Sequence, residues 1–210
     1  MLIYLIKLDG LNLTTQFVFI TELNAFMGNL FIGTGIATII VILVSKSVVM
    51  RFGWFWGAIM TPIMILVSGM LFFGSVFFSE LMDPISELLG ISTLFLSVWL
   101  GTIQNILSKS IKYGLFDPTK EMAYIPLEDA LKVKGKAAVD VIGARLGKAS
   151  GGYISSGLII IMGASIPGGA TTADIAPFLS YFIIGIIGVW IYAVFTLAKL
   201  YKAKLEETGR

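Results

Sequence analysis

The chain has 210 residues, of which 57% are hydrophobic and 13% are charged. Because soluble domains carry about 25% charged residues, this composition indicates an integral membrane protein, and the net charge of +2 gives no reason to expect nucleic acid as a partner. The sequence has no cysteine and no histidine, which excludes disulfides, thiolate metal sites and iron–sulfur clusters and removes the commonest metal ligand. We therefore expect neither a metal nor a cofactor.

The first 25 residues mix apolar and polar side chains. A membrane-spanning helix needs about 20 apolar residues, so the apolar run at residues 1–8 is too short to cross, and Lys7, Asp9 and Glu22 keep it from joining a longer apolar stretch. We predict that residues 1–25 form an external segment, either a loop or an interfacial stretch.

Longer apolar stretches come next and have the length and composition of membrane helices. We predict about five transmembrane helices, at residues 26–49, 54–78, 91–112, 137–164 and 174–198. Residues 113–136 should form a cytoplasmic loop within this bundle of residues 26–200, and residues 199–210 a cytoplasmic tail. Pro62 lies inside the second span, where a kink is expected rather than a break. The predicted fold class is an all-α membrane protein.

Nearly all basic residues near the predicted span ends lie on one side of the membrane. They are Lys46, Arg51, Lys109, Lys112, Lys120, Lys132, Lys134, Lys136, Lys199, Lys202, Lys204 and Arg210, whereas Lys7 lies on the opposite side. Because cytoplasmic loops carry the excess of lysine and arginine, we predict a cytoplasmic C-terminus and an external N-terminus.

The predicted number of spans is odd. Transporter folds are commonly built from paired repeats, so an odd number suggests a missing piece. We expect this chain to be the C-terminal part of a longer protein, or one half of a split protein that packs with a separate N-terminal half.

Two basic residues, Arg145 and Lys148, fall inside the predicted fourth span. They are three residues apart, so on a helix they share a face. Charges in or near hydrocarbon are costly and need water, an acidic partner or an anionic ligand. A span that begins near Lys148 would leave both cations at the membrane interface, whereas a continuous helix over 137–164 would place both well inside. The pattern leaves both possibilities open.

Polar residues also continue along the predicted third span. Gln104 and Asn105 are amides in an apolar helix, and such amides usually face the interior of a bundle, where they bond another helix or line a cavity. Lys109 and Lys112 add another turn to the same span. Anchoring at the membrane interface is the ordinary explanation for these two lysines.

Glycines recur at helical spacing in two predicted spans. They are Gly28, Gly33 and Gly35 in the first span, and Gly143, Gly147 and Gly151 in the fourth. Small residues let membrane helices approach closely, so we expect both sets to serve helix packing.

No motif for bond-breaking chemistry is present. The pairs Gly135-Lys136 and Gly147-Lys148 do not fit a phosphate-binding P-loop, because alanine follows each lysine where serine or threonine is required. Asp140 lies four residues after Lys136, so an ion pair within one helix is expected rather than a catalytic role. The sequence does not predict an enzyme.

Two long stretches carry a resemblance to known proteins. The first is Gly101–Leu127, which includes Lys112-Tyr-Gly-Leu-Phe-Asp-Pro-Thr-Lys-Glu-Met, and the second is Lys132–Lys148. Weaker similarities at Asn24–Gly28 and Arg51–Trp54 extend the resemblance over nearly the whole chain. Together these stretches resemble the ATP/ADP translocases of obligate intracellular bacteria and plastids.

The resemblance implies a carrier of about twelve spans, similar in architecture to the major facilitator superfamily, that exchanges ADP plus phosphate for ATP by alternating access. It makes the five predicted spans the eighth to the twelfth, so the chain would be half of such a transporter, in a bacterial inner membrane or plastid envelope. Two alternatives are a proton-coupled nucleotide importer of the same family and a non-transporting fragment that needs an N-terminal half.

The substrates implied by the resemblance are ATP and ADP, which carry several negative charges. Moving them through a low-dielectric region between lipid-facing helices requires compensating cations. The candidate substrate-binding residues, in descending order, are Arg145 and Lys148, then Asn105 for amide hydrogen bonds to the nucleotide, and then Lys109, Lys112 and Lys120, which would attract the anion before it enters.

Overall fold

The structure is a computed structural model that describes residues 13–164, 166 and 169–207. Its elements are α2 (Leu13–Phe52), α3 (Trp54–Phe77), α4 (Ser79–Leu89), α5 (Thr93–Ile111), η1 (Lys112–Phe116), α6 (Asp117–Ala123), α7 (Asp129–Lys136), η2 (Ala137–Gly143), α8 (Ala144–Gly163) and α9 (Thr172–Glu207). The described residues contain helices and no strand, and η1 and η2 are π-helical turns. The predicted all-α class is confirmed.

Three described helices are long and apolar enough to cross a membrane, namely Thr14–Phe52, Trp54–Phe77 and Asp174–Glu207. A fourth candidate is the pair formed by α4 and the helical stretch from Thr93 to Ala123, which meet at an angle of 96°. The chain is therefore an integral membrane protein. The larger number of five spans stays a prediction.

The first long helix begins earlier than the predicted first span. Residues 1–12 of the predicted external segment lie outside the described residues, but the remainder, residues 13–25, forms the first turns of α2 instead of a loop. Glu22 is the single charge in those turns, and the hydroxyl of Thr21 donates to the Phe17 carbonyl inside the helix. A lone carboxylate disfavours hydrocarbon but does not break a helix, so α2 extends beyond the predicted first span.

The predicted cytoplasmic loop is also largely helical. Residues 113–136 form most of η1, all of α6, a turn at 124–128 and then α7. Since α7, η2 and α8 follow one another without interruption from Asp129 to Gly163, we call them together the α7–α8 rod. The predicted fourth span at 137–164 is the larger part of this rod.

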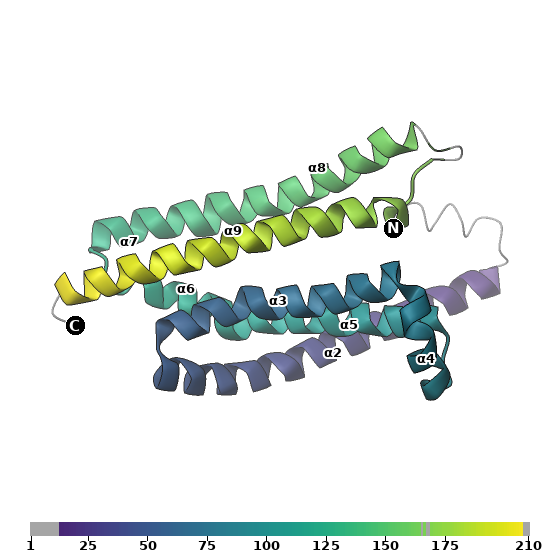
Figure 1. The fold of residues 1–210 in the computed structure, drawn as a ribbon, viewed down its shortest axis with the longest axis horizontal. Helices are drawn as coiled ribbons and strands as arrows, with labels where there is room; N and C mark the ends of the chain where they lie inside the picture. Colours follow the sequence, from purple (N-terminus) through teal and green to yellow (C-terminus); the bar gives the residue numbers. More distant parts are fainter. Residues whose placement is uncertain (1–12, 165, 167–168, 208–210) are drawn as a thin grey trace.

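The long helices lie roughly lengthwise beside one another, while α4 stands across them at one end (Figure 1). α3 packs against α5, α9 and α2, while α8 runs along α9, on the side away from α2 and α5. α6 lies near the beginning of α3 and connects the two groups of helices. α3 continues through Pro62, which is fully buried, so the proline does not break the helix.

A small core forms where α3 begins and α9 approaches its end. Trp54, Ala58 and Ile59 of α3 are buried together with Val194 of α9. The Trp54 indole Nε1 donates to the backbone carbonyl of Thr119 in α6 at 2.7 Å. This core holds α6 against both long helices and so fixes the charged residues that α6 carries.

Candidate functional site

Three of the predicted site residues share one face of α5 and its continuation. Asn105, Lys109 and Lys112 are spaced four and three residues apart, and Asn105 and Lys112 are exposed while Lys109 is half-buried. The Lys109 amine lies 5.6 Å from the centroid of the Phe31 ring, within cation–π range. This face therefore presents an amide and two positive charges, whereas neighbouring Gln104 donates to Ser108 of its own helix at 3.0 Å.

The lysines near the end of α5 belong to an ion-pair cluster, which we define as Lys112, Asp117, Lys120 and Asp140. The Lys112 amine lies 3.1 Å from Asp117, and the Lys120 amine lies 3.9 Å from the same carboxylate and 2.6 Å from Asp140. The side chain of Lys120 is 20% exposed. The cluster thus brings together two candidate cations and joins α6 to η2.

The contacts of Lys120 affect its protonation. The hydrogen bond to Asp140 raises the pKa of the Lys120 amine above its usual value, with burial opposing the shift and the nearby carboxylates adding to it. Next to it, burial raises the pKa of the Tyr124 hydroxyl. At neutral pH Lys120 is therefore a firmly charged ammonium group beside a neutral phenol.

The expected ion pair between Lys136 and Asp140 does not form. Asp140 pairs with Lys120, and Lys136 pairs with Glu121 of α6. The expectation assumed α-helical geometry, in which residues four apart are neighbours, but the wider π-helical turn η2 spans 137–143 and rotates Asp140 out of that register. Both side chains instead reach across to α6.

Arg145 and Lys148 lie in the first turns of α8 and are both exposed. Within the described residues neither forms an ion pair or hydrogen bond, and none links them to the cluster on α6. A Cβ added at Gly147 or Gly151 would meet nothing within 4 Å, so the glycine stripe expected to pack against another helix faces open space in this chain. These two cations, the first candidates for binding substrate, therefore stand together on an uncovered face of α8.

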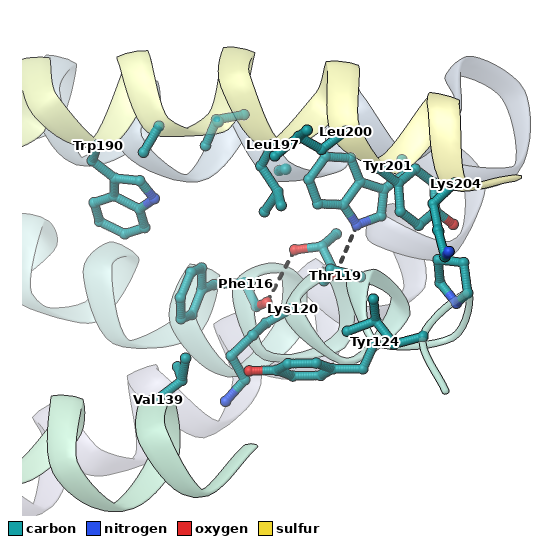
Figure 2. Close-up of a pocket in the computed structure, with 17 residues that line it drawn as sticks. Phe116, Thr119, Lys120, Tyr124, Val139, Trp190, Leu197, Leu200, Tyr201 and Lys204 are labelled. Atoms are coloured by element: carbon teal, nitrogen blue, oxygen red, sulfur yellow. Dashed lines mark hydrogen bonds between the residues drawn. The ribbon is translucent and has the colours of Figure 1, made fainter. Parts of the chain in front are cut away.

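The sequence reasoning missed a cavity beside the ion-pair cluster (Figure 2). It encloses about 480 Å³ between α3, α6, η2 and α9. The rings of Phe116 and Trp190, which both line it, meet edge-to-face with their centroids 5.3 Å apart. A sequence pattern on α9 could have indicated one wall of this cavity. Large apolar and aromatic residues recur there at spacings of four, three and four, which places them on one face of a helix, namely Trp190, Val194, Leu197 and Tyr201.

The long apolar helices define the class of protein as a polytopic, all-α membrane protein. A family model described as TLC ATP/ADP transporter matches residues 10–201. The chain belongs to this family of transporters.

Individual relatives agree with that assignment. The chain is 47% identical over 192 residues to ADP,ATP carrier protein 1 of Chlamydia trachomatis, an alignment that covers 91% of this chain and 35% of that protein. It is 40% identical over 195 residues to the chloroplastic ADP,ATP carrier protein 2 of Arabidopsis thaliana, covering 93% and 30%. For ADP,ATP carrier protein 4 of Rickettsia bellii the identity is 38% over 187 residues, covering 89% and 35%. The chain spans about a third of the length of these curated relatives, and no solved structure matches it.

Proposed function

We propose that this chain is the C-terminal part of a carrier that exchanges ATP for ADP across a membrane by alternating access, with adenine nucleotides as substrates and no bond broken. The observation that carries the proposal is the family match over residues 10–201, together with relatives named ADP,ATP carrier proteins. A separate N-terminal half, or an N-terminal portion of the same protein, would complete the transport pathway.

In this proposal the uncovered cations line the pathway. Arg145 and Lys148 share an exposed face of α8, and Asn105 and Lys112 share an exposed face of α5. A polyphosphate in a low-dielectric passage needs compensating cations, and its attraction to them is stronger there than in bulk water. We propose that Arg145 and Lys148 contact the phosphates and that Asn105 contacts the ribose, the base or a phosphate.

The proposed topology is based on the distribution of lysines. The lysine-rich ends of the helices would face the cytoplasm, with the N-terminus outside, in a bacterial inner membrane or a plastid envelope. The proposed bundle comprises five spans at 26–49, 54–78, 91–112, 137–164 and 174–198. α8, whose first turns carry Arg145 and Lys148, would then form most of the fourth span.

The test measures uptake of labelled ATP into cells that express the chain with and without an N-terminal half supplied from a relative. We expect uptake in the presence of the half and strongly reduced uptake at low ATP concentration in Arg145→Gln and Lys148→Gln. Each substitution should weaken apparent ATP affinity about tenfold or more, since a charge-assisted contact contributes about 1.5–3 kcal/mol.

The matched control is Lys134→Gln, which removes an exposed cation from α7 of the same rod. It should leave ATP affinity unchanged, and immunoblots of membrane fractions should show equal insertion of all variants. Unchanged affinity in both the Arg145 and Lys148 variants would remove these residues from the site. Loss of uptake on omitting internal ADP favours exchange, whereas dependence on a proton gradient favours a proton-coupled importer.

A further inference from the structure

The cavity near the end of α9 has a specific chemical character. Its walls are almost entirely apolar and rich in aromatic rings, including Trp54, Phe116 and Trp190. Among the described residues, Lys120 and Lys204 are its charged lining residues and no carboxylate lines it. A nucleoside triphosphate would need several polar partners in such a space, so the walls favour a ligand with a long apolar part and an anionic group.

The cavity is elongated along α9. Its lining residues on that helix run from Trp190 to Lys204, a distance of about 21 Å at 1.5 Å per residue. In Figure 2 Trp190 lies at one end, whereas Tyr201 and Lys204 lie at the other. One leaflet of a bilayer with its headgroups is about half of 40–45 Å thick, so the cavity has about the length of one leaflet and carries Lys204 at one end.

The rim of the cavity is exposed and apolar. Leu197 is 43% and Leu200 is 63% exposed, so an apolar molecule can enter from the side and cover both. The deeper wall is formed by Trp54 and Val194, which are buried and belong to the small core. A ligand in this cavity would therefore pack against the small core and cover the exposed apolar side chains along α9.

Both lining lysines are held in place by carboxylates outside the cavity. The Lys120 amine lies 2.6 Å from Asp140, and the Lys204 amine lies 2.7 Å from Glu207. An ammonium group has three N–H donors, so it can hold a carboxylate and a phosphate oxygen at the same time. Each amine can therefore keep its carboxylate partner while it also contacts an anionic headgroup.

We propose that this cavity binds an anionic phospholipid from the leaflet at the lysine-rich ends of the helices, with an acyl chain between Trp190 and Leu197 and its phosphate at Lys204. Basic pockets between membrane helices are a known setting for anionic headgroups. The site is separate from the exposed cations of α8, so it does not rest on the proposed transport function.

The test uses the purified chain in mixed micelles and quenching of tryptophan fluorescence by phospholipids with brominated acyl chains. Trp56 and Trp99 are exposed and would report any surrounding lipid, so both are first replaced by phenylalanine, which leaves Trp54 and Trp190 at the cavity. Brominated phosphatidylglycerol should quench half of the signal at about fivefold lower mole fraction than brominated phosphatidylcholine, the factor that one lysine–anion contact near a membrane surface gives.

Two substitutions then probe the site itself. Ala193→Phe fills the cavity and should abolish the preferential quenching, while Val189→Phe adds the same bulk at a position on α9 that is 69% exposed and should not. Lys204→Gln should bring the two lipids to equal quenching, while Lys202→Gln, which removes an exposed lysine outside the cavity, should preserve the difference.

Equal quenching by the two lipids in the starting protein would overturn the proposal, as would a preference that survives both Ala193→Phe and Lys204→Gln. Circular dichroism melts establish that each variant is folded. If Ala193→Phe does not fold, the comparison of Lys204→Gln with Lys202→Gln decides the outcome.

Discussion

The Lys120 amine lies 2.6 Å from a carboxylate oxygen of Asp140, a residue twenty positions further along the chain. This ion pair joins α6 to η2, and the pair between Lys136 and Glu121 joins α6 to α7. α8 packs mainly along α9, so these two ion pairs fix the beginning of the α7–α8 rod. They thereby set the position of Arg145, five residues beyond Asp140, relative to the α5 face.

The first prediction concerns the strength of the pair between Lys120 and Asp140. In a double-mutant cycle with Lys120→Met and Asp140→Asn, we expect a coupling energy of about 1 kcal/mol, the upper end for exposed pairs, because the lysine side chain is largely buried. The measurement is the shift of the thermal unfolding midpoint in detergent, about 2–4 °C for each kcal/mol in a chain of this size.

The matched control is the pair between Lys132 and Asp129, in which the carboxylate is 99% exposed and 3.4 Å from the amine. Its cycle should give no measurable coupling, because solvent screens such pairs. Equal coupling in the two cycles would mean that burial of Lys120 contributes nothing.

The second prediction concerns alkaline pH. The pKa of Lys120 is higher in the folded protein than in the unfolded chain, mainly because of its hydrogen bond to Asp140. The resulting stabilisation is therefore present below the ordinary lysine pKa and is lost as the pH rises through the raised value. Between about pH 9 and pH 12, the unfolding midpoint of the unsubstituted chain should fall further than that of Lys120→Met.

Neighbouring groups can contribute to this pH dependence. Asp117, Glu121 and Asp140 surround Lys120, and the nearby Tyr124 hydroxyl is a second group whose pKa is raised, mainly by burial. The comparison is therefore made in a Tyr124→Phe background. Parallel midpoint curves for the two proteins in that background would refute the role of Lys120.

Much of the fold could be predicted because apolar length alone specifies membrane helices. The predicted second span, 54–78, differs by one residue from α3 (Trp54–Phe77). The charged segments were harder to predict, because residues 13–25 and 113–136 lie outside the predicted spans and yet are largely helical. Polar residues in those segments are compatible with helix, since helix propensity depends on the backbone and side-chain entropy rather than on hydrophobicity.

The contacts within the site were harder to predict, because they depend on register and on neighbouring helices. The ion-pair partner of Asp140 was missed because a π-helical turn leaves no clear pattern in the sequence. The glycines show the same limit. Gly33 of the predicted first-span pattern does pack closely, since a Cβ there would lie 3.1 Å from Ile106 in α5, but Gly28 and Gly147 meet open space. The tighter approaches occur at Gly57 and Gly114, which the pattern did not single out.

The third prediction tests that close approach. A Cβ at Gly114 would lie 2.8 Å from Cγ1 of Val41 and 3.1 Å from the backbone nitrogen of Ile42 in α2. Since backbone cannot move aside easily, Gly114→Ala should lower the free energy of unfolding by about 1–3 kcal/mol.

Gly28→Ala is the matched control for Gly114→Ala, because nothing lies within 4 Å of the added methyl. In a helix interior this substitution should be neutral or stabilising by up to about 1 kcal/mol. Thermal unfolding in detergent checks both variants. A Gly114→Ala protein as stable as the unsubstituted chain would show that η1 and α2 separate without cost.

The fourth prediction concerns the small core that holds α6. Trp54→Phe removes the 2.7 Å hydrogen bond from the indole Nε1 to the Thr119 carbonyl and part of the stacking on Tyr201, whose ring centroid is 4.9 Å away. A buried hydrogen bond contributes about 0.5–1.5 kcal/mol, so the unfolding midpoint should fall by several degrees. Trp56→Phe, at a position 53% exposed, should change it by much less.

Because Trp54 anchors α6, its loss should also weaken the coupling between Lys120 and Asp140. The double-mutant cycle is therefore repeated in the Trp54→Phe background. Undiminished coupling there would show that α6 is held independently of this core.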